Sequence, residues 1–228
     1  MKGYTVNNIP LWLRPFIFLY GWLGGIFFYL LNAFFRLFCR IEYIGKEHIV
    51  NTPNHIFSIW HENVVLFFIV HRRFYKPNIF LSFPAWFMKP IHVMKKIIRV
   101  REIAYGASGH DGRAALSKVV HRLKEGWSTF LTPDGPYGPL KVIKDGVLMM
   151  SLESSTPIIP VAFHLSRDFR IPSWDRKRYP VPFCKITVVY GAPVSVTEAD
   201  FDAVRDVLAT HMNDPQEVVA GTNIAPEL

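Results

Sequence analysis

The hydrophobic pattern divides the chain into two parts. From Leu11 to Cys39 nearly every position is aliphatic or aromatic, and residues 15–35 are 21 consecutive positions without a formal charge. A run of this length is sufficient for a helix that crosses a bilayer, which needs about 20 residues. Beyond Glu42 the apolar runs are short and alternate with polar stretches that are compatible with helices. This alternation predicts an α/β domain.

The N-terminal apolar segment is compatible with more than one structure. Gly24 and Gly25 at its centre allow a break, so a helical hairpin within one leaflet competes with a single membrane-spanning helix. Arg14 and Arg36 lie near the two ends of the segment and favour the cytoplasmic side for both ends. A helix buried in the protein core is the third possibility. Because Pro15 follows Arg14 and no small-residue cleavage site precedes Arg36, we expect the segment to be retained and not removed as a signal peptide.

The remainder predicts a single-domain mixed sheet flanked by helices. The expected strands are at residues 55–60, 78–83, 98–104, 127–132, 157–163 and 185–190, and the expected helices at 62–72, 86–96, 111–125 and 146–154. Thr197 and Asp200 resemble a capping box that starts a final helix ending near His211. For 228 residues we expect one core. The expected parts are a membrane-associated segment at 1–40, an α/β domain at 41–214 and a flexible tail at 215–228.

The charge distribution restricts the partners. The net charge of +8 indicates an anionic partner. Between residues 63 and 101 there are eight lysines and arginines, no acid and many aromatic residues, which is typical of docking to an anionic membrane surface. Nucleic acid could use the same charges, but the apolar N-terminal segment favours a membrane and not nucleic acid. A solvated basic face beside a core stripe is the alternative without a partner.

Several common active-site motifs are absent from the sequence. There is no Walker A loop, dinucleotide-binding fingerprint or H-E-x-x-H motif, and residues 106–110 miss the nucleophile elbow because His110 occupies its fifth position. Cys39 and Cys184 are too few for a disulfide framework or a four-cysteine zinc site. These absences count against nucleotide hydrolysis, zinc proteolysis and serine hydrolysis.

Polar residues follow three of the predicted strands, where open α/β sheets place their sites. His61 follows the first strand, and a neutral imidazole there can act as a general base, although a purely structural histidine fits the same position. Asp134 lies in a turn rich in proline and glycine at residues 132–139. Lys141 and Lys144 follow this turn and are suited to a phosphate or anionic head group, or to a solvated loop. Ser108 precedes the helix at 111–125, whose first backbone N–H groups attract anions.

Five segments in a fixed order carry a family resemblance. They are Ile56-Phe57-Ser58-Ile59-Trp60-His61, Asp134-Gly135-Pro136, Lys144-Asp145-Gly146-Val147, Thr156-Pro157-Ile158-Ile159-Pro160-Val161, and Ser173-Trp174-Asp175-Arg176 through Pro182-Phe183. Together, over residues 41–196, they resemble the DUF374 branch of the lysophospholipid acyltransferase-like superfamily, to which a secondary acyltransferase of lipid A is also similar.

The resemblance implies acyl transfer from an acyl-ACP or acyl-CoA thioester to a hydroxyl of a lipid acceptor such as a lysophospholipid or lipid A precursor. It implies no metal and no bound organic cofactor, and a site on the cytoplasmic face of the bacterial inner membrane. The family's catalytic histidine and acidic turn map onto His61 and Asp134, which we take as the catalytic residues. Gly135 lies in the same turn, and we expect it to contact substrate together with Ser108, Arg113, Lys141 and Lys144.

The sequence departs from the superfamily at the position that orients the histidine. The superfamily has an acid five positions after its histidine, where this chain has Leu66 counted from His61. Asp134 or Asp111 could orient His61 from a neighbouring loop, whereas Glu62 would point about 100° away on a helix. Three interpretations follow: an acyltransferase, a catalytically impaired lipid-binding or scaffolding protein of the same fold, and an acyl ester hydrolase.

Overall fold

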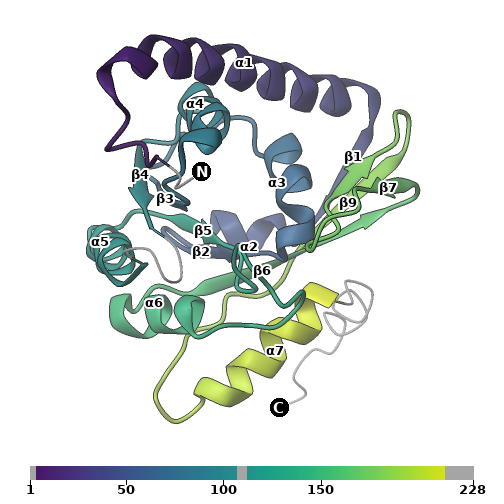
Figure 1. Ribbon diagram of the computed structural model, residues 1–228. Coiled ribbons are helices and arrows are strands. Elements are labelled where there is room, and N and C mark those ends of the chain that lie inside the picture. Colours follow the sequence, from purple (N-terminus) through teal and green to yellow (C-terminus); the bar gives the residue numbers. More distant parts are fainter. Residues whose placement is uncertain (1–3, 107–111, 214–228) are drawn as a thin grey trace, which may run out of the picture.

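The computed structural model describes residues 4–106 and 112–213, and it shows a mixed sheet between two layers of helices (Figure 1). The central sheet has the strand order β1-β9-β6-β2-β5. The bounds are β1 Arg40–Ile44, β9 Lys185–Tyr190, β6 Ile158–Leu165, β2 Ile56–Ser58 and β5 Thr129–Leu131. Neighbouring strands are parallel except for β6 and β9, which are antiparallel. The α/β fold class that the hydrophobic pattern predicts is therefore confirmed.

Two further strand pairs accompany this sheet. β3 (Ile79–Ser82) and β4 (Glu102–Tyr105) are parallel and continue it beyond β5, where the Ile79 backbone N–H donates to the Ser128 carbonyl at 3.1 Å. β7 (Asp168–Arg170) and β8 (Arg178–Pro180) form an antiparallel hairpin after β6. The strand predicted at 98–104 begins later because Ile98 caps the preceding helix and the chain turns at Arg99, which has a φ of 67°.

The helices cover both faces of the sheet. The bounds are α1 Arg14–Phe38, α2 Lys46–Val50, α3 Val64–Val70, α4 Lys89–Ile97, α5 Gly112–Lys124, α6 Gly146–Ser154 and α7 Phe201–Asn213, with short 3₁₀ helices η1 Leu11–Leu13, η2 His61–Asn63 and η3 Trp86–Met88. α1, α3 and α4 lie over one face and α5, α6 and α7 over the other (Figure 1). The central strands β2 and β6 are strongly apolar because both of their faces are buried.

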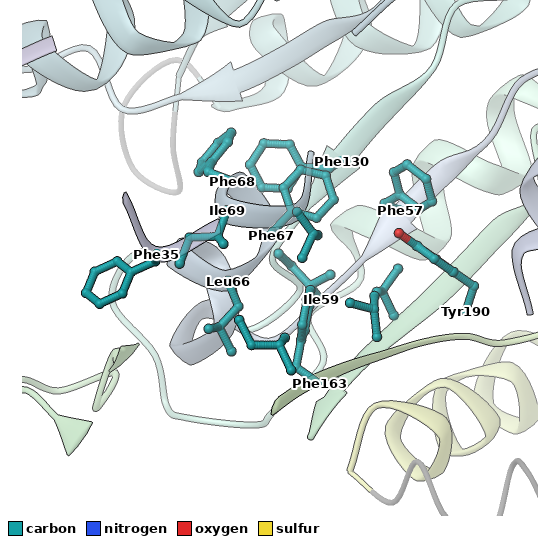
Figure 2. Close-up of a cluster of buried hydrophobic side chains, with 14 of the residues drawn as sticks. Phe35, Phe57, Ile59, Leu66, Phe67, Phe68, Ile69, Phe130, Phe163 and Tyr190 are labelled. Carbon is teal, nitrogen blue, oxygen red and sulfur yellow. The ribbon is translucent and has the colours of Figure 1, made fainter. Parts of the chain in front are cut away.

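The aromatic core beneath α3 is shown in Figure 2. Phe67 stacks on Phe130 with ring centroids 4.7 Å apart, and Phe57 meets Phe67 edge to face at 5.8 Å. A second apolar layer on the opposite face joins α5, α6 and α7 to the sheet. Because apolar side chains fill most of both faces, the ends of the strands are where polar groups of a site can gather with access to solvent.

α1 is one unbroken helix, so the hairpin interpretation of the N-terminal segment is wrong. Gly24 and Gly25 face α4: a Cβ at Gly24 would lie 2.8 Å from side-chain atoms of Pro90, and one at Gly25 would lie 2.6 Å from Val93 Cγ1. These glycines therefore permit a close approach of two helices and do not break one.

The outer face of α1 carries a row of exposed apolar side chains. The stretch from Leu11 to Phe38 is long and apolar enough to cross a membrane, yet only 22% of its most apolar window is buried. A helix buried in the protein core is thus also contradicted. α1 lies along α4 and α3 with one face packed against them and the other exposed (Figure 1); the exposed residues include Phe16, Leu19, Leu23, Phe27, Leu30 and Leu37.

Candidate active site

His61 lies at the carboxyl end of β2, as the apolar run before it predicts. Ile59 and Trp60 continue from the strand and are fully buried, and the chain then turns into η2. The His61 side chain is 20% exposed, so its ring is at the rim of the sheet and not in the core. Because β5 is parallel to β2, the turn that contains Asp134 reaches the same edge.

The imidazole of His61 is paired with Asp175. Its Nδ1 lies 2.6 Å from Asp175 Oδ2, and the Asp175 side chain is fully buried. The Nδ1–H of a neutral ring donates to this carboxylate, which leaves the lone pair of Nε2 as the proton acceptor. His61 and Asp175 therefore have the relative geometry of a general base and its orienting acid.

The Asp175 carboxylate is held by its own neighbours in sequence. Ser173 Oγ donates to Asp175 Oδ1 at 2.5 Å, and the Lys177 ammonium bonds to Oδ2. Burial alone would raise the pKa of Asp175, but the hydrogen bonds from Lys177 and Ser173 outweigh it, so the pKa lies below its usual value. Asp175 is consequently ionised at neutral pH.

The pKa of His61 is lowered from its ordinary value. Burial is the largest cause and the Lys177 cation adds to it, whereas the hydrogen bond and charge of Asp175 oppose the shift. The ring is therefore neutral near pH 7 and available as a base.

Asp134 has a different part in the same site. Its carboxylate is fully buried and accepts the backbone N–H of His61 at 3.1 and 3.3 Å, and that of Lys141 at 3.5 Å. Burial raises its pKa to about 6 against the effect of these amide hydrogen bonds. Asp134 thus fixes the backbone at His61. The sequence suggested Asp134 as a partner of the imidazole ring, but the ring pairs with Asp175 instead.

The two lysines expected near the turn differ in whether they pair with an acid. The Glu62 carboxylate pairs with Lys141 at 3.4 Å and with Arg170 at 3.6 Å. Lys144 forms no ion pair within residues 4–106 and 112–213, and its Nζ lies 3.1 Å from the position that a Cβ of Gly135 would occupy. Gly135, with a φ of 68°, therefore leaves room for this ammonium beside Asp134.

Two other expected contacts are not part of this cluster as described. Arg113 is exposed in the first turn of α5, and it forms no hydrogen bond or ion pair with the residues around His61 in the described parts of the chain. Ser108, and Asp111 as an alternative partner of His61, lie outside the described residues. Among those that are described, no group of three or more His, Cys, Asp or Glu side chains could hold a metal ion.

Asp175 and Trp174 are the site residues that the sequence analysis missed. The Trp174 ring centroid is 5.0 Å from that of His61, and a Cβ at Gly138 would lie 2.9 Å from the same indole. The segment between β7 and β8 therefore packs against both His61 and the turn after β5. The available signal was the resemblance at residues 173–176, which marked the segment without giving its acid a role.

Lys95 is a buried cation close to the end of β3. Its Nζ donates to Ser82 Oγ at 2.9 Å and to the Leu81 carbonyl at 3.3 Å, and no acid pairs with it within the described parts of the chain. Burial lowers the pKa of Lys95 to about 7.

This burial predicts a pH-dependent stability. The unfolded chain keeps the ordinary lysine pKa of 10.5, so between about pH 7 and 10 it binds a proton that the folded chain does not. The free energy of unfolding should therefore rise with pH in this window, by up to about 1.4 kcal/mol per pH unit. Urea unfolding of the unaltered chain and of Lys95→Met measures it: the slope should flatten in Lys95→Met and persist in the exposed neighbour variant Lys96→Met. Equal slopes in the unaltered chain and Lys95→Met would contradict the assignment.

Comparisons with known proteins agree with this fold. No protein-family model matches the chain. The uncharacterized protein RP090 of Rickettsia prowazekii (strain Madrid E) is 27% identical over 222 residues, which cover 93% of this chain and 92% of that protein. The crystal structure of the 1-acyl-sn-glycerophosphate (LPA) acyltransferase PlsC from Thermotoga maritima is similar with a TM-score of 0.51 and 17% identity, over 95% of this chain and 90% of that one. The chain therefore has the α/β fold of PlsC, including an N-terminal apolar helix.

Proposed function

We propose that this protein is a membrane-associated O-acyltransferase that moves a fatty acyl group from a thioester to a hydroxyl of a lipid acceptor. The observation that carries the proposal is the pairing of His61 Nδ1 with the buried Asp175 at 2.6 Å, at the carboxyl edge of the sheet. The similarity of the fold to PlsC and the resemblance to the DUF374 branch support it.

The proposed reaction uses the free nitrogen of His61. Nε2 accepts the proton of the acceptor hydroxyl as its oxygen forms a bond to the thioester carbonyl carbon. The resulting oxyanion is stabilised by backbone N–H donors, and collapse of the intermediate breaks the carbon–sulfur bond. The imidazolium returns the proton to the leaving thiolate, so the products are an ester and a thiol. Asp175 stabilises the transient imidazolium and keeps the ring oriented.

The charge of a lysine near His61 supports the proposed acceptor, and the family resemblance supports the proposed donor. Lys144, which forms no ion pair in the described part of the chain, is suited to an anionic head group such as that of a lysophospholipid or lipid A precursor. Lys141 shares its charge with Glu62 and contributes less. The donor is an acyl-ACP or acyl-CoA thioester.

Membrane association is proposed to occur through the outer face of α1. Its apolar side chains are exposed, and each buried methylene contributes about 0.8 kcal/mol. The exposed basic residues between 63 and 101, such as Lys96 and Arg99, would add attraction to anionic lipids. The proposed location is the cytoplasmic face of the bacterial inner membrane.

The alternative of a non-catalytic lipid-binding or scaffolding protein is based on position 66, where this chain has leucine and the superfamily has an acid. Leu66 is fully buried in the aromatic core and cannot orient the ring. Asp175 supplies a carboxylate from another part of the chain, and this favours an enzyme over a binding protein. An acyl ester hydrolase would use the same His61 and Asp175 with water as the acceptor.

An assay on the full chain in phospholipid vesicles separates these functions. Radiolabelled acyl-CoA or acyl-ACP is supplied with and without a mixture of lysophospholipids, and lipid products are resolved by chromatography. We expect acceptor-dependent consumption of donor and a new labelled lipid. Lipid binding without turnover would indicate a scaffold, and free fatty acid without a new lipid would indicate a hydrolase. Lipid profiles of cells with and without the gene would then identify the acceptor from the lyso-species that accumulates.

A further inference from the structure

A cavity lies at the amino-terminal end of β2, at the opposite end of this strand from His61. It has a volume of about 280 Å³ and is lined at its base by His55 and Phe57, where β2 begins. Strands rise about 3.3 Å per residue, so the step of six residues from His55 to His61 places the cavity about 15–20 Å from the reactive histidine. It is therefore a separate cavity and not an extension of the proposed active site.

The walls of this cavity are mostly apolar. Ile49 of α2, Phe57, Phe74 and Phe80 contribute apolar side chains, and Asn78, Ser128 and Thr129 also line it. His55 and His71 also line it, and burial lowers the pKa of each to about 4, so both imidazoles are neutral near pH 7. Such a lining suits an alkyl chain, and the volume approaches the lower end of small-molecule pockets, about 300 Å³.

The mouth of the cavity has the opposite character. Arg73, Tyr75 and Lys76 line it from the loop between α3 and β3, and Tyr75 is 80% exposed. Within the described residues neither Arg73 nor Lys76 pairs with an acid; Arg73 lies over the Tyr75 ring at 5.4 Å and Lys76 donates weakly to the Pro53 carbonyl at 3.4 Å. Two unneutralised cations at the rim of an apolar cavity are complementary to an anionic head group on an apolar chain.

The loop at the mouth is tied to the helix that we propose contacts the membrane. Arg72 donates to the Tyr29 hydroxyl of α1 at 2.9 Å, and Arg36 of α1 donates to the Val70 carbonyl at 3.3 Å. A single-chain lipid that leaves the bilayer next to α1 would meet this loop.

We propose that the cavity binds the alkyl chain of a single-chain anionic lipid, with its head group on Arg73 and Lys76, at a site distinct from His61. A free fatty acid and a lysophospholipid share this chemistry. The inference goes beyond the acyl transfer reaction because the bound lipid cannot reach His61 from this edge of the sheet.

Photo-crosslinking tests the site on the full chain in phosphatidylcholine nanodiscs. The probe is dodecanoic acid with a diazirine near the end of its chain, and labelled positions are mapped by mass spectrometry. We expect labels on Ile49 and on residues 74–80, and competition by excess dodecanoate or dodecanoyl lysophosphatidate but not by dodecanol. Whichever of the two anionic competitors is stronger identifies the head group. Labels confined to α1 or to the surroundings of His61, or equal competition by dodecanol, would overturn the proposal.

Variants separate the chain-binding and head-group contributions. Ile49→Trp should fill the cavity and abolish labelling, and the double variant Arg73→Glu with Lys76→Glu should reduce it about tenfold or more. The matched double variant Lys124→Glu with Arg167→Glu changes the net charge equally at two exposed positions that do not line the cavity, and it should label normally. Unchanged labelling in Ile49→Trp would refute the site. If the Ile49→Trp protein does not fold, the competition experiment on the unaltered chain still tests the proposal. The His61→Asn variant should be labelled like the unaltered chain, because His61 does not line the cavity. The labelling result therefore tests the cavity independently of whether His61 catalyses acyl transfer.

Discussion

Acyl transfer by the His61→Asn variant is expected to be about 10²- to 10⁴-fold slower than by the unaltered chain, because general-base action contributes a factor of this size. Asparagine is close to histidine in size and can still hydrogen bond to Asp175, but it has no nitrogen that accepts a proton. Initial rates with labelled acyl donor and lysophospholipid in vesicles measure the change.

The control for this variant is His121→Asn, which removes an imidazole from an exposed position on α5 that pairs with Glu125. It should leave the rate unchanged. Circular dichroism and vesicle binding of both proteins establish that they fold and associate with membranes equally. Full activity in the folded His61→Asn protein would eliminate His61 as the base, and with it the enzymatic mechanism proposed above.

The second large effect is expected from Asp175→Asn. The amide retains the shape of the carboxylate but does not stabilise the imidazolium, and it can accept Nδ1–H only through its oxygen. We expect the maximal rate to fall by about 10²-fold or more, as for loss of an electrostatic contact made in the transition state. A protein whose rate does not change with this substitution does not use Asp175 to orient the base.

The pH profile distinguishes an orienting role from a structural one. The neutral form of His61 is active, so the rate rises with pH as the ring loses its proton. Asp175 opposes the lowering of the His61 pKa and Lys177 contributes to it. Asp175→Asn should therefore move the acid limb to lower pH, and Lys177→Met should move it to higher pH. If both variants have a lower maximal rate but the acid limb of their pH profile stays at the same pH, the segment between β7 and β8 only supports the fold.

Local patterns in the sequence were sufficient to predict where most helices and strands lie along the chain. The apolar run before His61 predicted a strand that ends at a polar rim, because a strand buried on both faces exposes polar groups only beyond its ends. The Pro-Gly turn around Asp134 likewise predicted a loop at the same edge, since parallel strands end together. The α/β class followed from the alternation of short apolar runs with helical stretches.

Neighbouring residues did not reveal how the apolar N-terminal helix is used. Gly24 and Gly25 are compatible with a break or with close packing, and only the position of Pro90 and Val93 on α4 decides between them. The same limit applies to β7 and β8, whose three-residue strands are too short to produce a recognisable period.

The sequence by itself determined the α/β class, the apolar N-terminal segment and the place of His61 at a strand end, because each depends on residues near one another in the chain. Only the tertiary structure decided which acid orients the ring. Asp175 is 114 positions from His61 and reaches it through the β7–β8 hairpin. The spacing of residues along a chain carries no information about contacts that form when distant segments pack, so an acid missing from its expected position could be replaced from elsewhere without a local signal.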